Sequence, residues 1–151
     1  MFRGINSLSL DNKGRMSVPA KYRHCLGESC AGQLVVTIDR DRCLLIYPLP
    51  TWEEVEQKLI QLSSTNKRAR ELKRLLLGHA EDCEMDTQGR ILLPSPLREF
   101  ARLDKRVVLV GQGNKFEIWD EQTWYRLRDH WLNEEDRDMG DLPADLESLS
   151  F

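Results

Sequence analysis

Two short segments each place an aspartate four residues before an arginine, with a glycine directly before that arginine. They are Asp11–Arg15 and Asp86–Arg90. An arginine at the base of a hairpin can offer a planar pair of N–H donors to guanine O6 and N7, or to a phosphate. We therefore interpret Arg15 and Arg90 as candidate DNA-binding residues. The candidate turn-shaping and arginine-orienting residues are Asp11, Gly14, Asp86 and Gly89.

The first of these segments is the more basic of the two. Lys13 stands at its tip, and Arg3 and Lys21 are further candidates for phosphate contacts. Asn12 could reach an adenine edge. In the second segment, Thr87 and Gln88 replace Asn12 and Lys13. The sequence therefore favours the first segment for DNA binding, with the alternative that Asp11 pairs with Arg15 only to hold the hairpin.

The two aspartates also suggest a rival hypothesis, an enzyme with paired carboxylates near a twofold axis. Each aspartate is followed by its own arginine, which would keep both carboxylates ionised rather than sharing a proton. The pairs His79–Cys83 and His24–Cys25 lack further ligands at regular spacing for a metal. We expect no enzymatic activity, no metal, no cofactor and no small-molecule substrate, and interpret the four cysteines as reduced thiols.

An internal repeat must position these residues. The segment Leu10–Pro19 reappears as Met85–Pro94 at an offset of 75, with Asp, Gly, Arg and Pro identical, and Arg23 then corresponds to Arg98. Matches at offsets of 74 and 73 continue in the same order through each half of the chain. The chain is therefore interpreted as a duplicated unit.

Each unit is predicted to hold four short strands and two helices. In the first unit we predict strands over 5–10, 15–18, 33–38 and 43–47, and a helix over 20–26 closed by Gly27. A capping box at Thr51–Glu54 then opens an amphipathic helix with Trp52, Val55, Leu59 and Leu62 on one face. The second unit repeats the pattern with a turn at 86–89, segments at 94–101, 107–110 and 116–119, and a helix carrying Trp124, Leu127 and Trp131.

Eight strands from two units are enough to interleave into one closed barrel without open edges. The predicted fold class is mainly β with flanking helices (α+β), in which two swapped hairpins build the barrel and an amphipathic helix follows each repeat. The expected organisation is repeat 1 over 5–52, a helical connector over 53–78, repeat 2 over 81–124, and a C-terminal helix with an acidic tail over 125–151.

Charge is distributed unevenly along the chain. The net charge is −3, yet residues 1–128 carry 21 lysines and arginines against 17 acidic residues. Residues 129–151 carry 8 acidic residues and only Arg137. This tail has leucines at helical spacing, Leu142, Leu146 and Leu149, and could dock on a neighbouring subunit or compete with DNA. The alternative is a solubilising tail.

Composition excludes several classes of protein. The chain is 40% hydrophobic and 31% charged, which is typical of a globular protein. No apolar run reaches the roughly 18 residues of a membrane span, and no signal peptide is evident. We expect a cytoplasmic protein without a membrane partner.

The string Asp-x-x-Gly-Arg-apolar-x-apolar-Pro, followed by a short arginine-containing helix, resembles the SpoVT-AbrB family of swapped-hairpin barrels. Two copies in about 150 residues are opened by Met1–Gly4 and accompanied by Leu75–Ala80 and Gly111–Trp119. The resemblance covers residues 1 to about 132. It implies a nucleoid-associated transcriptional regulator, with the family's signature pairs at Asp11 with Arg15 and Asp86 with Arg90.

The resemblance further implies a repressor of the bacterial division and cell-wall gene cluster, including its own operon, that assembles as a ring-shaped homo-oligomer. Few positive charges per subunit predict weak binding to one site, so we expect repeated short promoter boxes and an avidity gain of ~100-fold or more. Two alternatives stay open. One is an AbrB-like assembly or antitoxin-type protein-binding module without specific DNA binding. The other is that the basic helix predicted over 66–77, with Lys67, Arg68, Arg70, Lys73 and Arg74, contacts phosphate rather than solvent alone.

Overall fold

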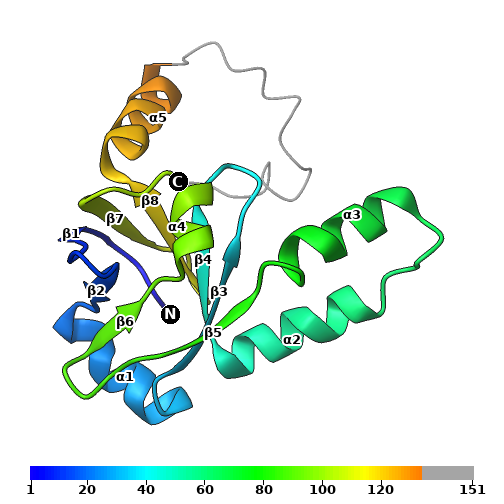
Figure 1. Cartoon of the computed structure of the whole chain (residues 1–151), viewed down its shortest axis with the longest axis horizontal. Coiled ribbons are helices and arrows are strands. Elements are labelled where there is room, and N and C mark those ends of the chain that lie inside the picture. Colours follow the sequence, from blue (N-terminus) through cyan, green and yellow to red (C-terminus); the bar gives the residue numbers. More distant parts are fainter. Residues whose placement is uncertain (134–151) are drawn as a thin grey trace, which may run out of the picture.

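The computed structural model describes residues 1–133 of the chain as an α+β fold, an antiparallel sheet with flanking helices (Figure 1). The acidic tail with Leu142, Leu146 and Leu149 lies outside the described residues. Within residues 1–133, no helix has the length and apolar character needed to cross a membrane.

In the described part of the chain, the main sheet has six antiparallel strands in the order β1-β7-β8-β4-β3-β5. Their bounds are β1 Ile5–Ser9, β3 Gln33–Ile38, β4 Leu44–Pro48, β5 Glu81–Glu84, β7 Arg106–Gly111 and β8 Phe116–Asp120. The two remaining strands, β2 (Arg15–Ser17) and β6 (Arg90–Leu92), pair with each other in a separate antiparallel ribbon. We call this pair of strands the ribbon.

The sheet order confirms the duplication and the exchange of hairpins between the repeats. Strand β1 of the first repeat pairs with β7 of the second, and β5 of the second repeat pairs with β3 of the first. In the repeat, β1, β3 and β4 correspond to β5, β7 and β8. Exchanging each strand for its counterpart turns the sheet order into the same order read from the other edge. The ribbon likewise takes one strand from each repeat.

The expectation that all eight strands join one closed barrel is wrong in its strand pairing. The described strands divide into six and two, with β1 and β5 at the edges of the larger sheet. The Asp-x-x-Gly turns fold β2 and β6 back across the sheet, where Met16 and Ile91 are buried at 0% and 1% exposure. Burial of these two side chains therefore places the ribbon over the core.

Within residues 1–133, five helices flank the sheet: α1 Ala20–Cys30, α2 Leu49–Ile60, α3 Lys67–Leu76, α4 Ser95–Phe100 and α5 Glu121–Asn133. Gly27 does not end α1, contrary to the sequence prediction. The helix continues to Cys30 and ends at Ala31 and Gly32, both with positive φ, whose N–H groups bond to the carbonyls of Gly27 and Leu26. Burial of Leu26 against the core keeps the chain helical through Gly27.

The capping box predicted at Thr51 is also wrong, because α2 already begins at Leu49 after Pro48 and has no side-chain cap. Trp52 and Leu59 are buried as expected, whereas Leu62 lies beyond the helix and is 37% exposed. Helices α2 and α3 form a hairpin that projects from the body, and we call it the arm (Figure 1).

Alternating side chains along the strands build a core on each face of the six-stranded sheet. Leu44 and Ile46 of β4 face the main core beneath the ribbon, α1 and α4. On the other face, Leu45 and Tyr47 pack against the arm. Further along that face, a third cluster joins β7 and β8 to Trp124 of α5. The arm and α5 therefore cover opposite halves of one sheet face.

Candidate nucleic-acid interface

The ribbon places two of the candidate arginines on a single outward face. Arg15 pairs with Leu92, Met16 with Ile91, and Ser17 with Arg90. Since side chains alternate across a strand and Met16 and Ile91 point into the core, Arg15 and Arg90 point outward. They are diagonal neighbours, for which the backbone separation is about 7–8 Å.

At the first turn, Asp11 holds both the backbone and Arg15. Its Oδ1 accepts hydrogen bonds from the N–H groups of Lys13 and Arg15, each at 2.9 Å. Its Oδ2 accepts one from Arg15 Nε at 2.6 Å. These bonds, the backbone N–H of Arg15 foremost, lower the pKa of Asp11 to about 2. The carboxylate is therefore ionised and fixes the guanidinium through Nε, which leaves Nη1 and Nη2 without a hydrogen bond to the described residues.

The second turn repeats this geometry. Asp86 Oδ1 accepts from the N–H groups of Gln88 at 2.9 Å and Arg90 at 2.8 Å, and its Oδ2 accepts from Arg90 Nε at 3.1 Å. The backbone N–H of Arg90 is the main reason that the pKa of Asp86 is also lowered. Each aspartate is thus tied to its own arginine, an arrangement unlike a pair of carboxylates sharing a proton.

Two further arginines lie against the turns, and they come from the exchanged repeats. Arg98 of α4 lies over Gly14, where an added Cβ would stand 2.4 Å from its Cζ, and its Nε donates to Leu93 O at 2.9 Å. Arg23 of α1 lies over Gly89 in the same way and donates from Nε to Val18 O at 2.7 Å. Sequence reasoning matched these two arginines in the repeat but assigned them no role at the turns.

The other sequence candidates lie in two places, at the first turn and near the start of β1. Lys13 is exposed at the first turn, and Asn12 lines a small hollow there with Arg98 and Lys105. Lys21 stacks on the Tyr22 ring, and the Tyr22 hydroxyl donates to the Arg3 carbonyl. Both lie at the far end of β1 from the Asp11 turn. The structure therefore does not gather all of the candidates around one turn.

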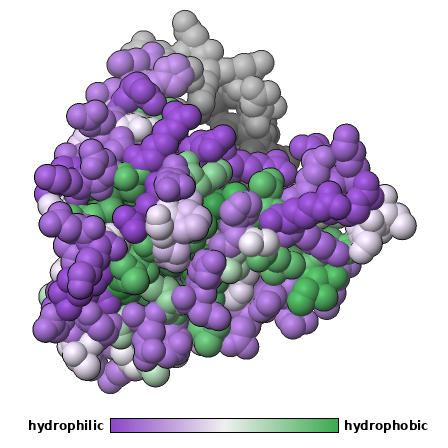
Figure 2. Space-filling view, in the orientation of Figure 1, coloured by the Kyte–Doolittle hydropathy of each residue, from purple (hydrophilic) through white to green (hydrophobic). Residues whose placement is uncertain are grey.

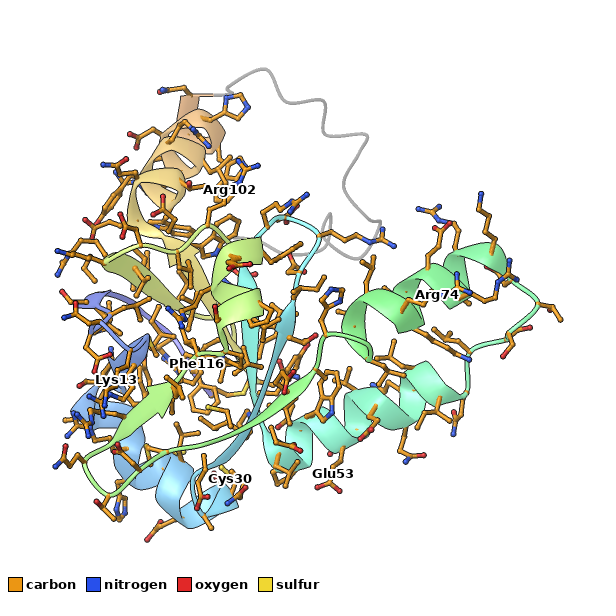
Figure 3. The ribbon with its side chains drawn as sticks, viewed as in Figure 1. Lys13, Cys30, Glu53, Arg74, Arg102 and Phe116 are labelled. Atoms are coloured by element: carbon orange, nitrogen blue, oxygen red, sulfur yellow. The ribbon has the colours of Figure 1, made fainter. Side chains whose placement is uncertain are left out.

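The basic helix α3 lies on the opposite side of the molecule from the first turn. Figure 3 shows Lys13 at the ribbon and Arg74 on the arm at opposite ends of the view. Two of the basic side chains of α3 bind the loop before it: Arg70 Nη1 donates to Ser64 O at 3.1 Å and Lys73 Nζ to Leu62 O at 2.5 Å. Contact between α3 and phosphate therefore stays a prediction separate from the ribbon.

Within residues 1–133, one group brings three metal-ligating atom types together: Asp39, Cys43 and Glu117, with ligand atoms within 4.8 Å of one another. Each already has a protein partner, because Cys43 Sγ donates to Asp39 and Glu117 accepts from Trp119 Nε1. Burial raises the pKa of the Cys43 thiol and so favours its protonated form. His79 instead bonds to the Leu75 carbonyl, and Cys83 lies in the main core, where burial raises the pKa of its thiol to about 11.

Comparison with known proteins gives concordant results. A family model described as "MraZ protein, putative antitoxin-like" matches residues 1–75 and again 76–140. A relative from Thioalkalivibrio sulfidiphilus, named transcriptional regulator MraZ, is 59% identical over 151 residues, the full length of both chains. Relatives of the same name from Methylococcus capsulatus and Escherichia coli O127:H6 are 59% and 54% identical over 152 aligned positions, again covering both chains completely.

Proposed function

The chain belongs to the MraZ family, and from that premise we propose that it is a DNA-binding transcriptional regulator that reads sequence with the outer face of the ribbon. The relatives at 50–60% identity are named as transcriptional regulators, a class of protein distinct from enzymes in general. The name supports DNA as the partner, and the geometry supports the place of contact.

The observation that carries the proposal is the pair of arginines on the ribbon. A two-stranded ribbon fits the major groove of B-DNA, which is about 12 Å wide. Arg15 and Arg90 stand on the same outward face, and each is held by its aspartate through Nε. The free Nη atoms are thereby pre-oriented as donors for guanine O6 and N7.

The turns at either end of the ribbon supply the contacts that position the protein on the backbone. Lys13 and Arg98 stand at the first turn, and Arg23 stands at the second. Such cations neutralise phosphates and contribute affinity without sequence information. We infer that Arg15 and Arg90 contact bases and that Lys13, Arg23 and Arg98 contact phosphates, with Asn12, Arg3 and Lys21 as further contacts.

The finer function follows the same reasoning. A single ribbon carries few cations, so several subunits on regularly spaced boxes are needed for tight binding. We propose that the chain acts as a ring-shaped homo-oligomer on direct repeats in promoters of the division and cell-wall gene cluster, including its own, chiefly as a repressor. Such a protein would work in the cytoplasm on the nucleoid.

The proposal is tested by fluorescence anisotropy with a duplex from upstream of the chain's own gene and a scrambled duplex, over a series of salt concentrations. Replacement Arg15→Ala should weaken binding to the native duplex by roughly 5- to 150-fold, the loss of one bidentate base contact. Binding to the scrambled duplex should change much less. Lys13→Ala should weaken both duplexes about equally and reduce the salt slope by about one unit.

Lys58→Ala, an exposed lysine on the arm, is the matched control and should leave both affinities unchanged. Light scattering of each variant reports the oligomer in parallel. If wild type binds both duplexes equally and Arg15→Ala changes neither, the proposal fails. Loss of the oligomer in Arg15→Ala would instead support the assembly or antitoxin-type alternative, which the description of the family model makes worth testing.

A further inference from the structure

A groove lies on the sheet face that the arm and α5 cover, between α3 and the β3–β4 turn. Its volume is about 440 Å³. The floor is apolar, and its principal side chains are Leu45, Tyr47, Leu72, Leu75, Leu76 and Phe100. Figure 2 shows apolar side chains at the surface between the body and the arm, surrounded by hydrophilic ones. An apolar recess of this kind on a small protein is suited to an apolar partner segment.

The rim of the groove is positively charged. Arg42 lies over the Phe100 ring at 4.7 Å and Lys115 over the Tyr47 ring at 5.7 Å, so both cations border the apolar floor. Arg40 lines the groove and also a second hollow of about 460 Å³ along α3. Among the described lining side chains Asp39 is the acidic one, and its Oδ2 already accepts the N–H of Asp41 at 3.1 Å. The groove therefore favours an acidic segment with regularly spaced apolar side chains.

The chain carries such a segment beyond the described residues. Residues 134–151 hold seven acidic residues against Arg137 alone, and Leu142, Leu146 and Leu149 recur at i, i+4 and i+7. We propose that this C-terminal segment binds in the groove of its own chain, with the three leucines on the apolar floor and the carboxylates at the basic rim.

The connection is long enough for binding within one chain. Strands β4 and β8 are paired, with Leu44 opposite Ile118. Two residues further along this register, Asp120 lies level with Arg42 in the β3–β4 turn. Since α5 begins at Glu121, the helix starts beside that turn. The 13 residues of α5 span about 20 Å at 1.5 Å per residue. Residues 134–141 can extend over about 26–29 Å, more than the length of the helix. The segment can therefore return along α5 to the groove.

Binding there would join the arm to the body. The floor combines α3 of the arm with β4 and α4 of the body. A segment seated across it contacts both and covers the apolar side chains of the groove.

Site-specific photocross-linking of the full-length protein tests this proposal. Leu146 is replaced by p-benzoylphenylalanine, and cross-linked peptides are identified by mass spectrometry. An equal mixture of ¹⁵N-labelled and unlabelled protein separates links within a chain from links between copies. We expect links within one chain to peptides of α3, β4 and α4. The same photoreactive residue in place of Ser148, which lies off the leucine spacing, is the control and should yield fewer of these links.

Charge reversal in the groove tests the role of the basic rim. The double replacement Arg40→Glu with Lys115→Glu should lower the yield of groove links roughly threefold to tenfold, because attraction becomes repulsion. Lys58→Glu with Arg126→Glu changes the net charge equally at exposed positions outside the groove and should leave the yield unchanged. Adding Asp145→Lys and Glu147→Lys to the groove variant should restore the yield.

Three results would overturn the proposal. They are links from position 146 to other surfaces, links only between differently labelled copies, and a groove-link yield that charge reversal does not lower. The tail replacements Asp145→Lys and Glu147→Lys alone lie outside the described fold. They should lower the yield in the same way, so the test does not depend on whether the groove variant folds.

Discussion

Replacing Gly14 by alanine should destabilise the protein, because the residue has a left-handed backbone conformation and lies against the side chain of Arg98. Gly14 has a φ of +85°, a conformation that costs an L-residue about 1–2 kcal/mol. The added Cβ would also stand 2.4 Å from Arg98 Cζ and 2.5 Å from its Nε. The guanidinium must therefore move away from the turn.

This movement of Arg98 breaks the 2.9 Å hydrogen bond from its Nε to the Leu93 carbonyl. A hydrogen bond from a charged donor contributes about 1.5–3 kcal/mol when buried, and the half-buried site of Arg98 reduces this contribution. Together with the backbone strain, we expect Gly14→Ala to lower the free energy of unfolding by about 2–3 kcal/mol. Gly89→Ala should behave similarly, because Arg23 Nε lies 2.5 Å from its added Cβ.

The assay is urea denaturation of the full-length protein, followed by circular dichroism at one fixed protein concentration. Gly27→Ala is the matched control. Gly27 lies inside α1 with no atom within 4 Å of an added Cβ, so alanine there should stabilise the protein by about 0.5–1 kcal/mol. The reasoning is refuted if Gly14→Ala unfolds at the wild-type urea concentration, or if the two replacements shift stability in the same direction.

Two other predictions concern acid stability and the attachment of the arm. The pKa of Asp11 is lowered to about 2 and that of Asp86 is also lowered, so their stabilising contribution is present above about pH 4 and is lost as the pH falls toward 2. Circular dichroism between pH 5 and 2 should therefore show that Asp11→Asn loses less stability on acidification than wild type. Superimposable curves for the two proteins would contradict this. Thr37 Oγ1 is fully buried and donates to the Leu76 carbonyl at 2.7 Å. Thr37→Val should therefore lower the free energy of unfolding by about 1–3 kcal/mol and speed amide hydrogen exchange in α3, whereas Thr65→Val is the exposed control. Unchanged exchange in α3 would show that this bond does not hold the arm.

The local pattern of the sequence was sufficient to predict most elements and the shape of the turns. The strand over Gln33–Ile38 has the predicted bounds, because its β-branched residues are buried on both faces of the sheet. The two Asp-x-x-Gly-Arg turns could be recognised because their hydrogen bonds join residues within four positions of one another. Interactions of such short range are encoded by neighbouring residue types.

The errors occur where distant contacts decide the structure. Gly27 is a reasonable helix terminator on its own, but Leu26 packs in the core and α1 continues to Cys30. The ribbon could not be separated from a closed barrel by counting strands, because burial of Met16 and Ile91 decides where it lies. The repeat made Arg23 and Arg98 equivalent, but only the exchange of hairpins places each against the other repeat's turn.

The pairing of β1 with β7 has a consequence for how the protein is made. Ile5 pairs with Val110, so β1 has no partner until more than 100 further residues have been synthesised. Contacts between residues so distant in sequence slow folding, and an unpaired strand edge is open to aggregation meanwhile. The first half of the chain therefore cannot complete its fold until β7 of the second half has been synthesised. The matched segments 1–75 and 76–140 are thus units of ancestry, while the unit of folding is the two together.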